Sequence, residues 1–195
     1  MKPQLYPILL IFISITNSSF SQTSLGKADG LAVMAKYAKI YPKFTREFQY
    51  INKTEQKIKG FYFFRGNSTG SPAKASKDGI IHIDVSFLEN PPKDYDDNRF
   101  VVLLYHELGH LYYFANNIKD NNREDNEKFA FEFSLRRTKN LALFGDCLPL
   151  KTGLKFMQQR SQSNDLQDEH VRALKRMMFS PMIKSYLSFV EKNCQ

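Results

Sequence analysis

Residues 100–115 have the sequence FVVLLYHELGHLYYFA, an apolar run that two histidines and one glutamate interrupt. A helix that is apolar on every side lies buried inside a domain. Ionisable groups in the middle of such a helix cost several kcal/mol unless they are paired or bind a metal. The stretch therefore predicts a buried central helix that carries a polar site.

The HExxH pattern in this stretch consists of His106, Glu107 and His110. Helix residues four apart lie on one face about one turn (~6 Å) apart, so both imidazoles can converge on one metal ion. Glu107 lies one position further round the helix, where a carboxylate serves as general base for a metal-activated water. The chain has only four histidines, so the pattern would rarely arise by chance. We predict a site for one zinc ion.

Gly109 lies inside the same predicted helix. A glycine in a helix interior costs about 1 kcal/mol relative to alanine. A compensating reason for its presence is a second segment of backbone that approaches closely at this position. We therefore expect another element to pack tightly against the histidine helix here.

The N-terminus has one lysine, then a mostly apolar run to about Ile15, then small polar residues. This pattern is typical of a secretory signal peptide, and it is shorter than the ~20 residues of a membrane anchor. Ser19 and Ser21 predict cleavage before Gln22; the alternative is a buried N-terminal helix. We expect residues 1–21 to be a signal peptide and residues 22–195 to be one domain, periplasmic or secreted, without a membrane span.

Cys147 and Cys194 are the two cysteines of the chain. In an exported protein a disulfide between them is the default expectation, with two free thiols as the alternative. Closing a loop of this length would stabilise the fold by about 4 kcal/mol in the chain-entropy model. We predict the Cys147–Cys194 bridge.

The formal net charge of the whole chain is +8. An excess of cations favours anionic surfaces, acidic substrates or nucleic acid. Here the lysines and arginines are spread along the chain without a block of five or more like charges or a nucleic-acid-binding motif. We expect ordinary solvated surface and no nucleic-acid partner; the sequence leaves the oligomeric state open.

The segments before the histidine helix predict helices and a small sheet. Apolar residues recur at helical spacing from Asp29 to about Ile40, with Pro42 as the stop, and a second short helix is expected over residues 44–50. Strands are expected over residues 57–65 and 79–87.

The second of these strands contains His82. If this strand were the sheet edge on which an extended peptide substrate lies, His82 would face the cleft. The alternative is a polar residue on the solvent face. Asp96 or Asp97 then caps the histidine helix, which is expected to run to about Asn116.

The stretch after that helix, residues 123–133, is ambiguous. Phe129, Phe131 and Phe133 alternate as in a strand. Early acidic residues, late arginines and a possible cap at Asn122 favour a helix, which we predict. Three amphipathic helices follow, over residues 151–160, 165–178 and 181–192. The fold class is therefore α+β, mainly helical, with a small sheet that precedes the HExxH helix.

A third protein ligand is needed, because catalytic zinc normally takes three protein ligands and one water. In metzincins it is a histidine six residues after the second, but Asn116 stands there. In gluzincins it is a glutamate from a second helix. The segment Asn126-Glu127-Lys128-Phe129-Ala130 resembles the Asn-Glu-Gly-Phe-Ala of the zinc aminopeptidases.

A thermolysin-like alignment would instead put the ligand at Arg123, which cannot bind zinc, with Glu124 adjacent. Glu127 is therefore the first choice, Glu124 the second, and Asp125 and Glu132 follow. The resemblance covers only residues 106–132. It implies a zincin-like domain in which His106, His110 and Glu127 hold one Zn²⁺.

The resemblance implies an exported gluzincin-type zinc peptidase that hydrolyses a peptide or protein substrate, with Glu107 as general base. A tetrahedral oxyanion needs a further donor, for which His170, Tyr112 and Tyr113 are candidates. One alternative is an inactive zincin-like protein that binds a peptide or protein partner. Another is a basic surface-binding module in which HExxH is incidental.

Overall fold

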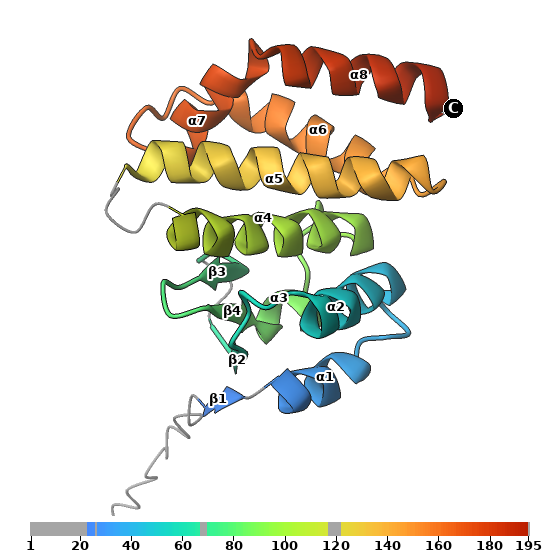
Figure 1. The fold of residues 1–195 in the computed structure, drawn as a ribbon, viewed down its shortest axis with the longest axis vertical. Coiled ribbons are helices and arrows are strands. Elements are labelled where there is room, and N and C mark those ends of the chain that lie inside the picture. Colours follow the sequence, from blue (N-terminus) through green and yellow to red (C-terminus); the bar gives the residue numbers. More distant parts are fainter. Residues whose placement is uncertain (1–22, 26, 67–69, 117–121, 195) are drawn as a thin grey trace, which may run out of the picture.

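The computed structural model describes residues 23–25, 27–66, 70–116 and 122–194. The elements stack in layers, with a small sheet and its covering helices on one side and a group of helices on the other (Figure 1). Two long helices, α4 (Asp97–Asn116) and α5 (Arg123–Leu143), lie side by side between these layers. The predicted signal peptide lies outside the described residues.

The first layer contains the elements that precede α4. They are β1 (Thr23–Leu25), α1 (Lys27–Ala35), α2 (Pro42–Thr54), β2 (Gly60–Phe64), β3 (Ala73–Ala75), β4 (Ile80–Asp84) and α3 (Val85–Glu89). The second layer follows α5 and contains α6 (Leu148–Ser161), α7 (Glu169–Met178) and α8 (Pro181–Asn193). The chain is therefore mainly helical, with a small mixed sheet before the histidine helix, and the predicted α+β class is confirmed.

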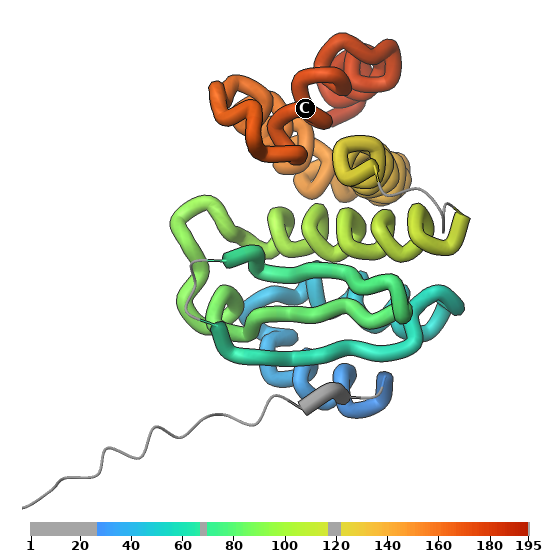
Figure 2. Tube along the Cα trace, turned by 90° about the vertical axis from the view of Figure 1, so that its left-hand side faces the viewer, coloured from blue at the N-terminus to red at the C-terminus, as the bar shows by residue number. Residues whose placement is uncertain are grey.

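The sheet has the strand order β1-β2-β4-β3. β2 and β4 are parallel, whereas β1 pairs with β2 and β3 with β4 in antiparallel fashion. β3 is the edge strand nearest α4, as Figure 2 shows. β4, the strand that contains His82, is paired on both sides, so it is not the edge strand that was considered as a place for an extended peptide.

The ends of the long helices follow their capping residues. The Asp96 carboxylate accepts a hydrogen bond from the backbone N–H of Arg99 (2.8 Å), as predicted for a cap of α4. Asp97 instead accepts from the backbone N–H groups of Lys43 and Phe44 at the start of α2. Asn122 accepts from the Asp125 N–H (3.2 Å), which caps α5.

α5 is a helix, as predicted, although its phenylalanines alternate along the sequence as they would in a strand. Phe133 belongs to the apolar cluster around the sheet and α4, whereas Phe131 belongs to the cluster that α5 forms with α6 to α8. A helix between two layers must be apolar on both sides. This explains the strand-like alternation of the phenylalanines.

Several boundaries differ from the prediction. The first helix ends at Ala35, and Pro42 is not a stop but begins α2, since the missing N–H of proline is harmless in a first helical turn. The second strand ends at Asp84, whose side chain accepts from the N–H of Ser86 and starts α3. The short strands β1 and β3 were not predicted.

The two cysteines form the predicted disulfide, with a Cα–Cα distance of 5.6 Å. It joins the start of α6 to the end of α8 and so closes the second layer. A disulfide indicates an oxidising compartment. None of the helices in the described part of the chain is long and apolar enough to cross a membrane.

Candidate metal centre

The site begins with the close contact between α4 and α5. A Cβ atom on Gly109 would lie 2.8 Å from Cα of Ala130 and 3.0 Å from Cβ of Phe133. This is the close backbone approach that the glycine predicted. One turn before Ala130 on α5, Glu127 therefore comes within reach of the histidines.

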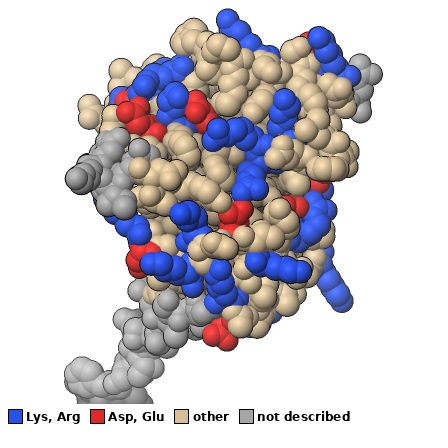
Figure 3. Space-filling model, in the orientation of Figure 1, with Lys and Arg blue, Asp and Glu red and all other residues tan. Residues whose placement is uncertain are grey.

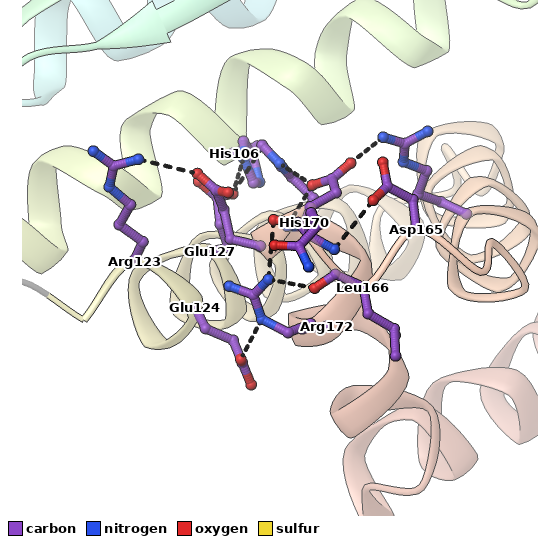
Figure 4. A network of polar contacts seen from close by, with 12 residues as sticks. His106, Arg123, Glu124, Glu127, Asp165, Leu166, His170 and Arg172 are labelled. Atoms are coloured by element: carbon purple, nitrogen blue, oxygen red, sulfur yellow. Dashed lines mark hydrogen bonds and ion pairs between the residues drawn. The ribbon is translucent and has the colours of Figure 1, made fainter.

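Three side chains meet at this contact, as Figure 4 shows for two of them. Nε2 of His106 lies 3.1 Å from Nε2 of His110 and 3.2 Å from Oε2 of Glu127. Nε2 of His110 lies 3.6 Å from Oε1 of Glu127. All three residues are buried, and their ligand atoms lie within 4.8 Å of one another.

Asn126 orients one of the histidines. Nδ1 of His110 lies 2.9 Å from Oδ1 of Asn126. With the carboxamide oxygen as acceptor, the ring proton is on Nδ1, and the lone pair of Nε2 faces His106. Such an outer partner fixes the tautomer of a metal-binding histidine. Nδ1 of His106 is buried without a hydrogen-bond partner in the described structure.

Burial sets the protonation of this group. It holds the pKa of His106 well below its usual range, and it lowers the pKa of His110 to about 4, with the neighbouring His106 acting in the same direction. Both rings are therefore neutral at pH 7, which is the form that binds metals. Burial and the nearby carboxylate of Glu127 raise the pKa of Glu107 to about 8.

Two carboxylate oxygens here could accept a cation. Oε2 of Glu107 and Oε2 of Glu127 are buried without a hydrogen-bond donor among the described residues. Buried acceptors of this kind are costly unless they are satisfied. Two neutral imidazoles beside a carboxylate are also a usual donor set for a divalent transition metal.

The structure adds His170 of α7 to the group (Figure 4). Its Nε2 lies 3.3 Å from Oε2 of Glu127, and its Nδ1 lies 2.9 Å from Oδ1 of Asp168, which also caps α7. Burial alone would raise the pKa of Asp168, but hydrogen bonds from His170 and the charge of Arg160 outweigh it and lower the pKa. Asp168 is thus an anion that holds the ring.

The other candidate acids of α5 point elsewhere. Glu124 pairs with Arg172 (3.0 Å) and Arg176 (2.7 Å) of α7, and Asp125 also pairs with Arg176. Glu132 pairs with Lys128 at 2.6 Å. Of the four acids considered from the sequence, Glu127 alone lies beside both histidines.

The remaining candidates lie away from the histidines. The Tyr112 hydroxyl donates to Glu55 (2.5 Å), and the buried ring of Tyr113 packs against Phe129. His82 contacts Ser76, on the sheet. None of the three lines the cleft at the metal-binding group.

A cleft of about 320 Å³ opens beside His106, Glu107 and His170. Its walls come from the segment before β3, from α4, and from α5 to α7. The other residues that line it are Gly70, Ser71, Pro72, Tyr95, Arg99, Val102, Leu103, Phe131, Phe156 and Arg160.

Sequence reasoning missed three residues around the group. Asn126 was quoted as part of the motif but given no role. Asp168 was not considered, although the spacing Asp168-x-His170 could have suggested a carboxylate–histidine pair. Arg99 gave no signal, because an arginine in the first turn of a helix is ordinarily solvated.

Comparisons with protein-family models, with curated proteins and with solved structures find no match. The interpretation therefore rests on the site itself. The buried group His106, His110 and Glu127 on α4 and α5 has the geometry of the zincin motif, HExxH with a downstream glutamate, and it could hold one metal ion.

Proposed function

We propose that this chain is an exported zinc peptidase of the gluzincin type, in which His106, His110 and Glu127 hold one Zn²⁺. The observation that carries the proposal is the spacing of the ligand atoms of these three side chains. Two atoms that each lie 2.0–2.1 Å from a tetrahedral zinc are about 3.3–3.4 Å apart. The two Nε2 atoms are 3.1 Å apart, Oε2 of Glu127 lies 3.2 Å from Nε2 of His106, and Oε1 of Glu127 lies 3.6 Å from Nε2 of His110.

When bound, zinc acts as a Lewis acid that acidifies water and polarises a peptide carbonyl. Glu107 supplies the general base. It lines the cleft, and one of its oxygens has no donor among the described residues. A carboxylate in this position can take a proton from the attacking water and pass it to the leaving amine.

His170 is proposed as the donor to the oxyanion. It lines the same cleft, its ring is half-exposed, and Asp168 holds its Nδ1. This leaves Nε2 directed toward the metal-binding group, where the doubly protonated ring, with Nδ1–H donated to Asp168, can donate Nε2–H to developing negative charge. His170 takes this role in the proposal in place of Tyr112 and Tyr113.

The substrate is proposed to be a peptide or protein. The cleft of about 320 Å³ opens beside the metal-binding group, and the segment before the edge strand β3 forms one of its walls. Lysines and arginines outnumber acidic residues on the face seen in Figure 3. A peptide is preferred to a nucleic acid because the sequence has no block of five or more like charges and no nucleic-acid-binding motif.

Glu107→Gln tests the function, because glutamine keeps the shape of the side chain but cannot accept the proton. The variant should fold, bind about one zinc per chain and lose hydrolysis of a mixed peptide library by ~10²–10⁴-fold. Glu132→Gln, a change on α5 outside the cleft, is the matched control and should retain activity.

Zinc content and cleavage are measured on the same preparations. A variant that cleaves as fast as the parent would refute the role of Glu107. A parent protein that holds zinc and cleaves nothing in a broad library would favour the inactive, partner-binding alternative.

A further inference from the structure

The cleft contains a buried cation that the proposed chemistry does not use. Arg99 is 9% exposed and lines the cleft together with His106 and His170. Its guanidinium lies on the ring of Phe156, with Cζ 3.0 Å from the ring centroid. Burial lowers the pKa of Arg99 to about 10, so the side chain stays charged at neutral pH.

This cation lacks a carboxylate partner. No acidic side chain in the described part of the chain forms an ion pair with it; the groups that favour its charge are the Tyr95 hydroxyl and, at longer range, Asp96 and Asp94. The second arginine of the cleft differs, since Arg160 is paired with Asp168. Burying an unpaired charge is costly, which indicates a site built for an anion from outside.

The position of Arg99 relates that anion to the metal-binding group. Arg99 precedes His106 by seven residues, so both lie on one face of α4 about 10 Å apart along the axis. Val102 and Leu103 lie between them and form an apolar wall of the cleft. Since an extended residue spans about 3.5 Å, this distance corresponds to about three residues of a bound peptide.

We infer that Arg99 is the receptor for a carboxylate of the substrate, at most about three residues from the bond that is cut. This rests on the proposed peptidase function and adds its substrate class. The planar guanidinium can bind a carboxylate through two parallel hydrogen bonds. The carboxylate comes either from the C-terminus of a short peptide or from an aspartate or glutamate side chain.

Binding is tested in the Glu107→Gln background, so that no peptide is cut. Four acetylated peptides of one apolar sequence are compared by calorimetry, as two matched pairs. The first pair is a peptide with a free C-terminal carboxylate and its C-terminal amide. The second pair is a C-terminal amide with glutamate near the end and the same amide with glutamine in that place. One of the two carboxylate peptides should bind ~10- to 100-fold tighter than its neutral partner. The carboxylate peptide that binds more tightly than its neutral partner identifies the source of the carboxylate.

The matched variants are Arg99→Met and Arg160→Met. Arg99→Met keeps an unbranched stem against Phe156 and should abolish the preference for the carboxylate without lowering the melting temperature, because it removes an unpaired buried charge. Arg160→Met should retain most of the preference. A purely structural Arg99 would show the opposite: a lower melting temperature and an unchanged preference.

The inference is overturned if neither carboxylate peptide binds better than its neutral partner, or if the preference survives Arg99→Met. Both readouts are binding measurements. They therefore hold whether or not the parent protein cleaves peptides, and a failure of the proposed function is seen separately in the cleavage assay.

Discussion

Gly109→Ala tests whether the contact between α4 and α5 builds the metal site. The new methyl group would lie 2.8 Å from Cα of Ala130 and 3.0 Å from Cβ of Phe133. Carbon atoms in contact prefer about 3.5–4.0 Å, so the helices must separate by ~1 Å. The first of these contacts is with backbone, which no change of rotamer can relieve.

The expected loss of stability is the difference of two terms. Overpacking costs ~1–3 kcal/mol, and a clash with backbone belongs in the upper part of that range. Alanine recovers about 1 kcal/mol of helix propensity. The net loss of ~1–2 kcal/mol corresponds to a melting temperature about 2–8 °C lower for a domain of this size.

The same separation moves Glu127 away from the histidines. We expect zinc affinity, measured by competition with a chelator, to fall about 10- to 100-fold, as when a supporting partner of a metal ligand is lost. Gly153→Ala is the matched control, because its methyl group would meet only side-chain atoms of Val102 and Leu135 at 3.3–3.5 Å.

Gly153→Ala should leave the melting temperature equal or higher and the zinc affinity unchanged. If Gly109→Ala is as stable as Gly153→Ala and binds zinc as tightly as the parent, the close contact does not position the ligand, and this reasoning is refuted.

Glu127→Ala should lower zinc affinity, measured by competition with a chelator, by more than the ~100-fold seen when a residue that only supports a metal ligand is lost. Glu124→Ala should change the affinity little. A larger loss of zinc affinity for Glu124→Ala than for Glu127→Ala would support the thermolysin-like register. Hydrogen bonds from Arg176 and Arg172 of α7 hold the pKa of Glu124 below its usual value of 4.5. Its contribution to stability is therefore present above that value and lost as the pH falls below it, so the difference in melting temperature between the parent and Glu124→Ala should stay constant from pH 7 to about pH 5 and shrink at lower pH. Replacing Cys147 and Cys194 by serine should cost about 4 kcal/mol of unfolding free energy in a denaturant titration, and full alkylation of the unreduced parent would contradict the bridge. Intact mass of the exported protein should correspond to a chain that begins at Gln22, and a mass that includes residues 1–21 would exclude the predicted cleavage.

Local sequence features were sufficient for much of the fold. The apolar run around HExxH, with Asp96 before it, predicted α4 correctly because helix formation and capping depend on neighbours within one turn. Gly109 predicted a close helix contact because a helix-interior glycine is costly without one. The disulfide was predicted from two cysteines in a chain that begins with a predicted signal peptide, and the structure contains it.

Features that depend on packing were less accessible. The short strand β3 (Ala73–Ala75) has too few residues for a visible alternation and exists because β4 offers it a partner. Residues 85–89 continue the apolar pattern of β4, but the Asp84 side chain bonds to the following N–H and turns the chain into a helix.

The sequence by itself determined the arrangement of His106, Glu107 and His110, because it depends only on the pitch of one helix. The third member of the group was decided by tertiary structure. Glu124 and Glu127 differ by about 60° around the helix and ~4.5 Å along it. The contact of α5 with Gly109 directs Glu127 to the histidines and leaves Glu124 to the arginines of α7. His170 reaches the same cleft only because α7, which is distant from α4 in sequence, packs beside it. Arg99 shares α4 with His106, but its burial against Phe156 depends on the packing of α6, and no local pattern specifies that packing.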